Sequence, residues 1–519
     1  MDNSMIRLLE RAAERFPDKT ALADENTSYT YREYLDSARI VGGYIAEVMA
    51  PGTVRQPIAV LIERNAKSIV AFMGIVCSGN FYVPLDAGLP EERLGVILSE
   101  LSPAGIIDCR GVSGEKAKEA AGIAGRSAVT FEEILSYYGK DAGRADTLVE
   151  ERIAETIDTD PLYAIFTSGS TGVPKGVLVS HRSVMDLTDA FAEVFSFDEG
   201  SVFGNQAPFD FDVSVKDIYN AMKCGGRVEV IPKRMFVRPN LLLPYLAERE
   251  INTLIWAVSA VRIVAEFRAL DEVRLEKPLR LRYIMFSGEV MPVKSLNYFM
   301  ERMPETVFVN LYGPTEITCN CTYYIVDRQY APDEMLPIGR AFPNTRILLL
   351  DEQQRRINEP GKTGEICVEG SCLALGYWNA PARTAESFCQ NPEIKGYSGL
   401  IYRTGDLAYF REDGSLVFAS RKDFQIKHMG HRIELGEIEA ALNGIEWIDV
   451  SCCLYDTVKE KIFCFYQAEV EDRKGIVKIL STKLPKYMWP NKYIRVDAMP
   501  LNAHGKIDRR ALEELKEKG

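Results

Sequence analysis

Apolar segments typical of buried strands alternate with amphipathic helical segments along most of the chain. The pattern predicts a strand at residues 253–258, a helix at 260–270 and a strand at 282–286. Because strand–helix–strand order is typical of sheets covered by helices, it predicts an α/β fold. The start of the chain shows the same alternation, with helices expected at 8–16, 31–48 and 66–76 and strands at 59–62 and 81–84.

The pattern changes near residue 338, where short strands are separated by Gly, Pro and Asp. Strands are expected at 346–350, 364–368 and 416–418, which predicts a β-rich subdomain. A small α+β pattern follows, with helices at 435–442 and 475–484 and strands at 448–455, 461–470 and 493–496. We place the boundary at the charged stretch 421–423, which predicts an N-terminal domain over 1–422 and a C-terminal domain over 423–519.

Composition excludes several classes of protein. The 519 residues include 62 basic and 74 acidic side chains, and the net charge of −12 disfavours a nucleic-acid binder. The longest apolar stretch is about half of the ~20 residues that span a bilayer, and no secretory leader is readable. Eleven cysteines without a CxxC pair indicate a reducing, cytoplasmic setting, and the presence of only four histidines argues against a His-rich metal site or a Ser/His triad.

A glycine-rich turn is the strongest local motif. Residues 163–176 run from an apolar strand through hydroxyl-rich glycine positions to Lys175, and this combination of amide and hydroxyl donors with one cation suits a phosphate. The turn is not a Walker A loop, because Gly169 and Lys175 are six residues apart without Gly-Lys-Ser/Thr, and it is not a Rossmann fingerprint. A flexible Ser/Gly loop between two strands is the alternative interpretation.

Further motifs follow this turn in order along the chain. They are Asn-Leu-Tyr-Gly-Pro-Thr-Glu at 310–316, Tyr-Arg-Thr-Gly-Asp at 402–406, the segments 420–427 and 430–439, and Asn-Ala-His-Gly-Lys-Ile-Asp at 502–508. Together they closely resemble the adenylate-forming superfamily, and specifically the amino-acid adenylation domains of nonribosomal peptide synthesis. Segments 211–219, 287–292 and 423–427 look most like the stand-alone D-alanine:carrier-protein ligases, and the resemblance covers about residues 29–512.

The resemblance implies a fold and a two-step reaction. A large N-terminal AMP-binding domain would carry a small mobile C-terminal lid. An amino acid would react with ATP to give aminoacyl-AMP and pyrophosphate, and the acyl group would then pass to the phosphopantetheine thiol of a separate carrier protein. Mg²⁺ would assist at the phosphates. Since the protein forms few covalent bonds in such a reaction, catalysis would come from alignment and charge neutralisation.

The family motifs also imply roles for single residues. Thr315 would donate to the α-phosphate, Glu316 would hold Mg²⁺, and Lys506 would be a mobile catalytic cation. The alternatives are a carboxylate at a helix N-terminus for Glu316 and a turn residue for Lys506. The nucleotide-binding residues implied are Thr167, Ser168, Gly169, Ser170, Thr171, Gly172, Lys175, Asn310, Leu311, Tyr312 (stacked on adenine), Gly313, Pro314, Thr315, Asp406 (on the ribose), Phe418, Arg421 and Lys506.

Between the domains, Asp423 matches the family's hinge aspartate. We expect the lid to rotate there, which would withdraw Lys506 and bring the thiolation loop around Lys427 and Gly430 to the active site. Ser420 departs from the family, which usually has glycine before Arg421. That arginine is implied to contact ribose or phosphate, and a solvated surface arginine is the alternative.

Asp212 matches the aspartate that pairs with the α-ammonium of an amino-acid substrate, and a capping aspartate is the alternative. Two pocket positions depart from the D-alanine branch, which has cysteine at Ser287 and an apolar residue at Lys216. Bulky members of the pocket predict a small side chain in the substrate. The pocket residues implied are Asp212, Val213, Lys216, Trp256, Met285, Ser287, Leu311, Cys319, Asn320 and Lys506.

The substrate stays open between two classes. A buried ammonium would favour an aspartate-like or asparagine-like amino acid, whereas alanine fits if Lys216 turns to solvent or pairs with Asp217. Competing functions are an acyl-CoA synthetase and a non-catalytic amino-acid or nucleotide sensor. We expect a monomer without nucleic-acid partner or membrane insertion, and a basic patch near 422–432 for an acidic carrier protein.

Overall fold

The computed structural model describes residues 4–111, 120, 122–126, 128–138, 142–169, 173–422, 424–501 and 507–518. The chain divides into two compact units. Unit 1 comprises Met1–Asp86, Leu101–Ile165 and Gly176–Lys422, and unit 2 comprises Ala87–Glu100, Phe166–Lys175 and Asp423–Gly519. The sequence did not predict that two earlier segments belong with the C-terminal part. The domain boundary and hinge at Asp423 stay predictions, since that residue lies outside the described ranges.

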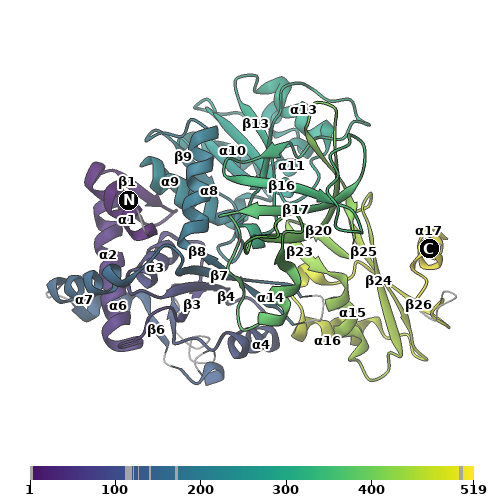
Figure 1. Cartoon of the computed structure of the whole chain (residues 1–519), viewed down its shortest axis with the longest axis horizontal. Helices are drawn as coiled ribbons and strands as arrows, with labels where there is room; N and C mark the ends of the chain where they lie inside the picture. Colours follow the sequence, from purple (N-terminus) through teal and green to yellow (C-terminus); the bar gives the residue numbers. More distant parts are fainter. Residues whose placement is uncertain are drawn as a thin grey trace. The chain divides into compact units, whose positions relative to one another are not determined.

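A nine-stranded sheet organises the larger part of unit 1 (Figure 1). Its strand order is β15-β14-β13-β12-β11-β9-β10-β1-β2, with parallel pairing from β13 to β1 and antiparallel pairing at both edges. The strands are β1 (Thr20–Ala23), β2 (Ser28–Thr30), β9 (Val202–Asn205), β10 (Arg227–Val230), β11 (Thr253–Ala257), β12 (Tyr283–Ser287), β13 (Val307–Tyr312), β14 (Thr322–Ile325) and β15 (Arg340–Ala341).

The central strands β9 to β13 of this sheet are largely buried on both faces, and successive side chains pack in different cores. Ile255 and Met285 belong to one cluster with side chains of α8 and α9, whereas Leu254 and Ile284 belong to a second cluster with α10, α11 and α13. The elements here are α8 (His181–Val194), α9 (Val213–Cys224), η2 (Lys233–Met235), α10 (Pro239–Glu248), α11 (Val258–Glu266), α12 (Ala269–Glu272), α13 (Val293–Arg302) and the 3₁₀ turn η3 (Thr315–Ile317).

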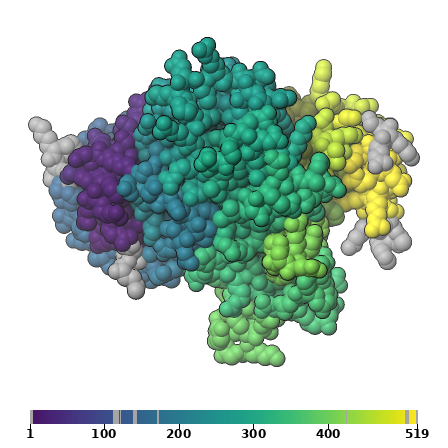
Figure 2. Space-filling model, turned by 90° about the horizontal axis from the view of Figure 1, so that it is seen from above, coloured from purple at the N-terminus to yellow at the C-terminus, as the bar shows by residue number. Residues whose placement is uncertain are grey.

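A second, seven-stranded sheet has the order β18-β8-β7-β4-β3-β5-β6. Helix α3 packs against β3 and β4 of this sheet, α1 and α2 pack in turn against α3, and Figure 2 shows the N-terminal segment (purple) beside a blue part of the chain. The elements are α1 (Met5–Arg15), α2 (Tyr31–Tyr44), the π-helical turn η1 (Ile45–Met49), β3 (Pro57–Ile62), α3 (Ala66–Cys77), β4 (Phe81–Asp86), β5 (Gly105–Asp108), β6 (Ala128–Thr130), α6 (Phe131–Tyr138), α7 (Ala142–Glu155), β7 (Pro161–Thr167), β8 (Lys175–Ser180) and β18 (Gly376–Tyr377).

The β-rich part of unit 1 is an antiparallel sheet of order β16-β17-β20-β19, with β21 added to β20. It brings Asp406, on β20, directly opposite Arg421, on β21. Its elements are β16 (Thr345–Leu350), β17 (Gly364–Gly370), α14 (Pro381–Ser387), β19 (Phe388–Gln390), β20 (Leu400–Phe410) and β21 (Leu416–Arg421).

Unit 2 combines a hairpin, a three-stranded sheet and helices. β24 and β25 pair antiparallel, and β26 pairs parallel to β25. The elements are α4 (Glu91–Leu101), most of which lies in this unit, β22 (Gln425–His428), β23 (His431–Glu434), α15 (Leu435–Asn443), β24 (Val450–Asp456), β25 (Lys461–Gln467), α16 (Arg473–Lys483), η4 (Lys486–Met488), β26 (Lys492–Val496) and α17 (Arg509–Lys518).

These elements confirm the predicted α/β class with a β-rich subdomain and an α+β C-terminal part. The single helix predicted over 260–270 is wrong, because Arg268 adopts a left-handed conformation (φ 48°) and separates α11 from α12. The strand predicted over 461–470 ends three residues early, at Gln467. In the part of the chain that the structure describes, no helix has the length and apolarity that a membrane crossing would require.

Candidate functional site

The carboxyl ends of the parallel strands in the nine-stranded sheet mark the position of the site. From β9 the chain continues to β10 on one side, whereas β11, β12 and β13 lie on the other side of β9. Ligands of open α/β sheets bind outside the carboxyl ends of strands at such a reversal of strand order. The loop 206–212 follows β9, Ser287 ends β12 and Tyr312 ends β13, so residues from all three implied motifs meet this edge.

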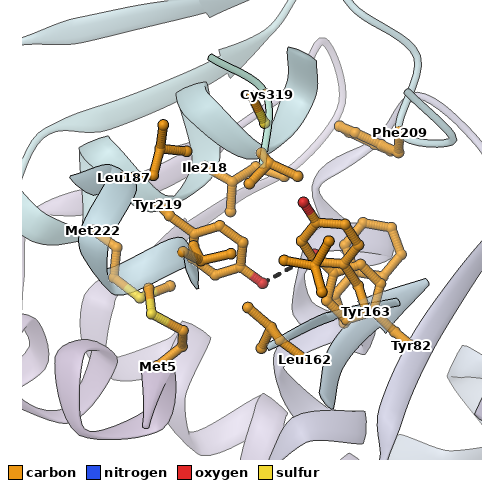
Figure 3. Close-up of a cluster of buried hydrophobic side chains, with 14 of the residues drawn as sticks. Met5, Tyr82, Leu162, Tyr163, Leu187, Phe209, Ile218, Tyr219, Met222 and Cys319 are labelled. Atoms are coloured by element: carbon orange, nitrogen blue, oxygen red, sulfur yellow. Dashed lines mark hydrogen bonds between the residues drawn. The ribbon is translucent and has the colours of Figure 1, made fainter. Parts of the chain in front are cut away.

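Helix α9 supplies the pocket residues that follow β9. Asp212 precedes its first residue and makes no capping hydrogen bond, and the backbone carbonyl of Asp212 accepts from the Cys319 thiol (3.0 Å). The capping alternative for Asp212 is therefore wrong. Ser214 through Met222 are all buried, and Figure 3 shows Ile218, Tyr219 and Met222 packed in the core, where the hydroxyls of Tyr219 and Tyr82 are 3.0 Å apart. Such packing gives the pocket a rigid support.

Lys216 is a buried ammonium on this helix. Its side chain is 1% exposed, and Nζ donates to Asn320 Oδ1 (2.9 Å) and Ser287 Oγ (3.3 Å). The alternative in which Lys216 turns to solvent is therefore wrong. Burial lowers the pKa of Lys216, and the nearby Cys319, Asp212 and Asp217 partly oppose that shift. Among the described residues, no carboxylate forms an ion pair with it.

Asp217 follows Lys216 on the same helix and is also buried. Its Oδ2 accepts from Asn205 Nδ2 (3.0 Å), while its buried Oδ1 has no partner among the described residues. Burial raises the pKa of Asp217 to about 7. At neutral pH this carboxyl is thus only partly ionised, and it compensates the charge of Lys216 weakly.

Trp256 is not brought together with the other pocket residues. It is paired with Phe286 in the sheet register, packs edge-on against Phe236 and donates its indole N–H to the Gly204 carbonyl (2.6 Å). Trp256 belongs to the second core cluster, whereas Met285 and Leu311 belong to the first. Met285 and Leu311 therefore lie on the α9 side of the sheet, where Cys319 is also buried.

Asp406 lies at the centre of a buried polar cluster. Its Oδ2 accepts from the Tyr312 hydroxyl (2.5 Å) and its Oδ1 from Arg421 Nη1 (2.5 Å). Burial and the neighbouring carboxylate raise the pKa of Tyr312 well above its usual value, so the phenol stays a donor. Each carboxylate oxygen has two acceptor sites, and the cluster fixes the carboxylate while leaving capacity for two further donors. Arg421 is not a solvated surface residue.

The segment after β13 carries Thr315 and Glu316, both buried. Glu316 Oε1 accepts from the Tyr377 hydroxyl (2.9 Å), and the Glu316 carbonyl accepts from the Ala374 amide. A side chain on Gly313 would meet the backbone of Asn320 at 2.6 Å, so this turn requires glycine.

Mg²⁺ is the metal that the family implies. Within the described ranges no group of three or more His, Cys, Asp or Glu side chains offers a metal site. A single carboxylate such as that of Glu316 nevertheless fits Mg²⁺, which is commonly held by one or two carboxylates together with waters and substrate phosphates.

The rest of the implied nucleotide site is partly described. The Asn310 amide donates to the Pro337 carbonyl (2.8 Å), and Phe418 packs at the edge of the first core cluster. In unit 2, Ser168 Oγ donates to the Arg432 carbonyl (2.7 Å), and the Thr167 hydroxyl is buried without a partner among the described residues. Outside the described residues lie Ser170, Thr171, Gly172 and Lys506.

The implied thiolation loop is the tight hairpin of β22 and β23. Lys427 pairs with Arg432, and the turn residues Met429 (φ 53°) and Gly430 (φ 80°) both have positive φ. Two consecutive positive φ values are typical of a type I′ turn, which the glycine favours. The backbone conformation by itself therefore accounts for a glycine at position 430.

Sequence reasoning missed several residues of these clusters. Tyr377 donates a hydrogen bond to Glu316, and Asn205 donates one to Asp217, but neither residue lies in a recognisable sequence motif. The same holds for the ion pair between Arg93, on α4, and Glu437, on α15. Burial raises the pKa of Glu437, and Arg93 opposes that shift.

Comparisons with known proteins agree with this geometry. A profile described as AMP-binding enzyme matches residues 9–378. The chain belongs to the family of AMP-binding enzymes. It is 31% identical to the D-alanine--D-alanyl carrier protein ligase of Bacillus licheniformis over 98% of this chain and 99% of that one. It is 30% identical to tyrocidine synthase 1 of Brevibacillus parabrevis over 98% of this chain but only 45% of that longer protein.

Solved structures place this AMP-binding enzyme among adenylation domains. Holo-PA1221, a nonribosomal peptide synthetase protein containing adenylation and carrier (PCP) domains bound to a vinylsulfonamide inhibitor, superimposes with a TM-score of 0.83. The sequence identity is 26%, over 99% of this chain and 84% of that chain. The adenylate-forming fold and the resemblance to amino-acid adenylating ligases are thereby confirmed.

Proposed function

We propose that this AMP-binding enzyme joins a small or polar amino acid to AMP, with release of pyrophosphate, and transfers the aminoacyl group to the phosphopantetheine thiol of a separate carrier protein. The observation that carries the proposal is the cluster of Tyr312, Asp406 and Arg421. A carboxylate fixed by two donors, with capacity for two more, suits the adjacent hydroxyls of a ribose.

In the first step, a substrate carboxylate oxygen bonds to the α-phosphorus of ATP, and the bond to the β-phosphate oxygen breaks. In this proposal Thr315 and Lys506 stabilise charge at the α-phosphate, and the loop 167–175 holds the leaving pyrophosphate. Glu316 would hold Mg²⁺, which neutralises phosphate charge when bound. In the second step, the carrier thiolate attacks the acyl carbon and AMP leaves with its electron pair.

The substrate is proposed from the pocket. The carboxylate of Asp212 would pair with the α-ammonium, which a fatty-acid or aryl-acid ligase has no need to bind. Met285 and Leu311 support a short side chain. Two candidates remain, since the names of the carrier protein ligases favour alanine, whereas the buried Lys216 favours an aspartate-like or asparagine-like substrate.

Rotation of the lid about Asp423 would separate the two steps. Asp423→Pro should leave ATP–pyrophosphate exchange largely intact while slowing transfer to the carrier protein, because only the second step requires the rotated lid. Equal loss of both half-reactions would contradict the hinge. Lys427 and Gly430 belong to the loop that would face the arm of the carrier during transfer.

ATP–pyrophosphate exchange tests the first step, and transfer of radiolabelled amino acid to a holo carrier protein tests the second. Lys506→Ala should abolish exchange, and Lys459→Ala, an exposed lysine in the same part of the chain, is the matched control. Full exchange by Lys506→Ala would favour a sensor. Efficient transfer to coenzyme A would instead favour an acyl-CoA synthetase.

A further inference from the structure

The acceptors that face the Lys216 ammonium show what the pocket lacks, which is an anion. An ammonium carries three N–H donors, and Lys216 directs two of them to Asn320 Oδ1 and Ser287 Oγ. Both acceptors are neutral and both side chains are buried, at 3% and 5% exposure. The third donor has no partner among the described residues. A buried ammonium with only neutral acceptors is costly unless an anion joins it.

Asn320 adds a second unused donor at the same place. Its Oδ1 is occupied by Lys216, and its Nδ2 is buried without a partner among the described residues. Oδ1 and Nδ2 belong to one amide group, so this nitrogen lies beside the ammonium. Two adjacent donors of this kind match the two oxygens of one carboxylate.

The other charges around the pocket do not replace that anion. Under the proposed function, the Asp212 carboxylate pairs with the α-ammonium of the substrate. Asp217 is bound to Asn205 and is only partly ionised, and Arg64, near Asp217, donates to three main-chain carbonyls. The Cys319 thiol is neutral, because burial raises its pKa well above the usual value.

We propose that the substrate is an amino acid with a short carboxylate side chain, aspartate rather than alanine, and that Lys216 and Asn320 bind this carboxylate. The inference rests on the proposed function and names its substrate class. Asparagine is disfavoured, because its amide would turn a donor toward Nζ or Nδ2. Glutamate is disfavoured, because Met285 and Leu311 limit the depth of the pocket.

The test is ATP–pyrophosphate exchange by the full chain with both enantiomers of aspartate, asparagine, glutamate and alanine. We expect kcat/KM for one enantiomer of aspartate to exceed that for asparagine and alanine by about 100-fold or more, since a site built around buried donors rejects analogues that leave them unpaired. Exchange best supported by alanine or another apolar amino acid would overturn the inference and leave the proposed function standing. Exchange with no amino acid at all would overturn both.

Two variants test whether Lys216 and Asn320 recognise the side-chain carboxylate of the substrate. Lys216→Met keeps the length of the side chain without the charge and should lower kcat/KM for aspartate by about 100-fold, which would remove the preference for aspartate over alanine. Asn320→Asp keeps the volume but supplies Lys216 with an internal anion, and it should also remove the preference for aspartate. Lys223→Met, on the same helix but partly exposed, is the control and should retain the preference. Unchanged aspartate selectivity in both pocket variants would refute the assignment.

Discussion

His181 makes the stability of unit 1 depend on pH. It is the first residue of α8, is 2% exposed, and its Nδ1 accepts from the backbone amide of Met5 (3.0 Å), at the start of α1. The flanking Ser4 gives α1 no side-chain cap, so this imidazole caps the helix from 176 residues away. Protonation would remove the acceptor and place a cation at a helix N-terminus, which the helix dipole disfavours.

Burial lowers the pKa of His181 from 6.5 to about 4, and Asp160 and Asp158 only partly oppose this shift. A group whose pKa is depressed on folding adds stability that is complete above its unfolded pKa and is lost as pH falls through the folded pKa. The full contribution is about 3 kcal/mol. Between pH 7.5 and 5.5 the loss should be about 1 kcal/mol.

Equilibrium urea unfolding, followed by circular dichroism, of the wild type and of His181→Asn measures this loss. Asparagine can offer an acceptor to the Met5 amide but does not titrate. The variant should be less stable at pH 7.5, because it fills less of the core, and the difference should shrink by about 1 kcal/mol at pH 5.5. A difference that stays constant or grows as pH falls would refute the reasoning.

Three further substitutions test other features. Tyr312→Phe removes a hydrogen-bond donor from Asp406 and should lower kcat/KM for ATP in the exchange assay by about 10-fold or more. An unchanged value would mean that the tyrosine does not position the Asp406 carboxylate. Gly339→Ala should lower the free energy of unfolding in urea by more than about 2 kcal/mol, because the new Cβ would lie 2.0 Å from a β14 carbonyl oxygen. The control Gly361→Ala has a similar positive φ but open space around the new Cβ, so it should cost clearly less. Equal losses in the two variants would contradict this reasoning. Trp256→Phe leaves the buried Gly204 carbonyl without its donor and should lower the free energy of unfolding by about 1–2 kcal/mol. The ranking of amino-acid substrates in the exchange assay should not change. A new ranking would mean that the indole reaches the substrate.

The alternation of strands and helices predicted most of the fold, because strand and helix periods are local properties of the sequence. The face toward which a strand residue points was harder to predict. In β11 every residue from Thr253 to Trp256 is buried, so no polar position distinguishes the two faces, and family alignment alone assigned Trp256 to the pocket. Only the register with β12 shows it on the opposite side from Met285.

The motifs predicted which residues form the candidate site but not how they bind one another. Tyr312 and Asp406 are 94 residues apart, and their hydrogen bond depends on the packing of the β-rich sheet. The partners of Lys216 could not be predicted either, because α9 is buried on nearly all sides and its sequence pattern gives no polar face. The unpaired donors around this lysine became visible only with Asn320 and Ser287 in place.

The position of β1 in the nine-stranded sheet, between β10 and the edge strand β2, has a consequence for synthesis on the ribosome. β1 (Thr20–Ala23) has β10 (Arg227–Val230) as its parallel neighbour, so the N-terminal strands await a partner made roughly 200 residues later. At about 5–20 residues per second this interval lasts about 10–40 s. During that time the β1–β2 hairpin has no native sheet to join, and we expect the nascent chain to be most exposed to aggregation or chaperone binding in this window.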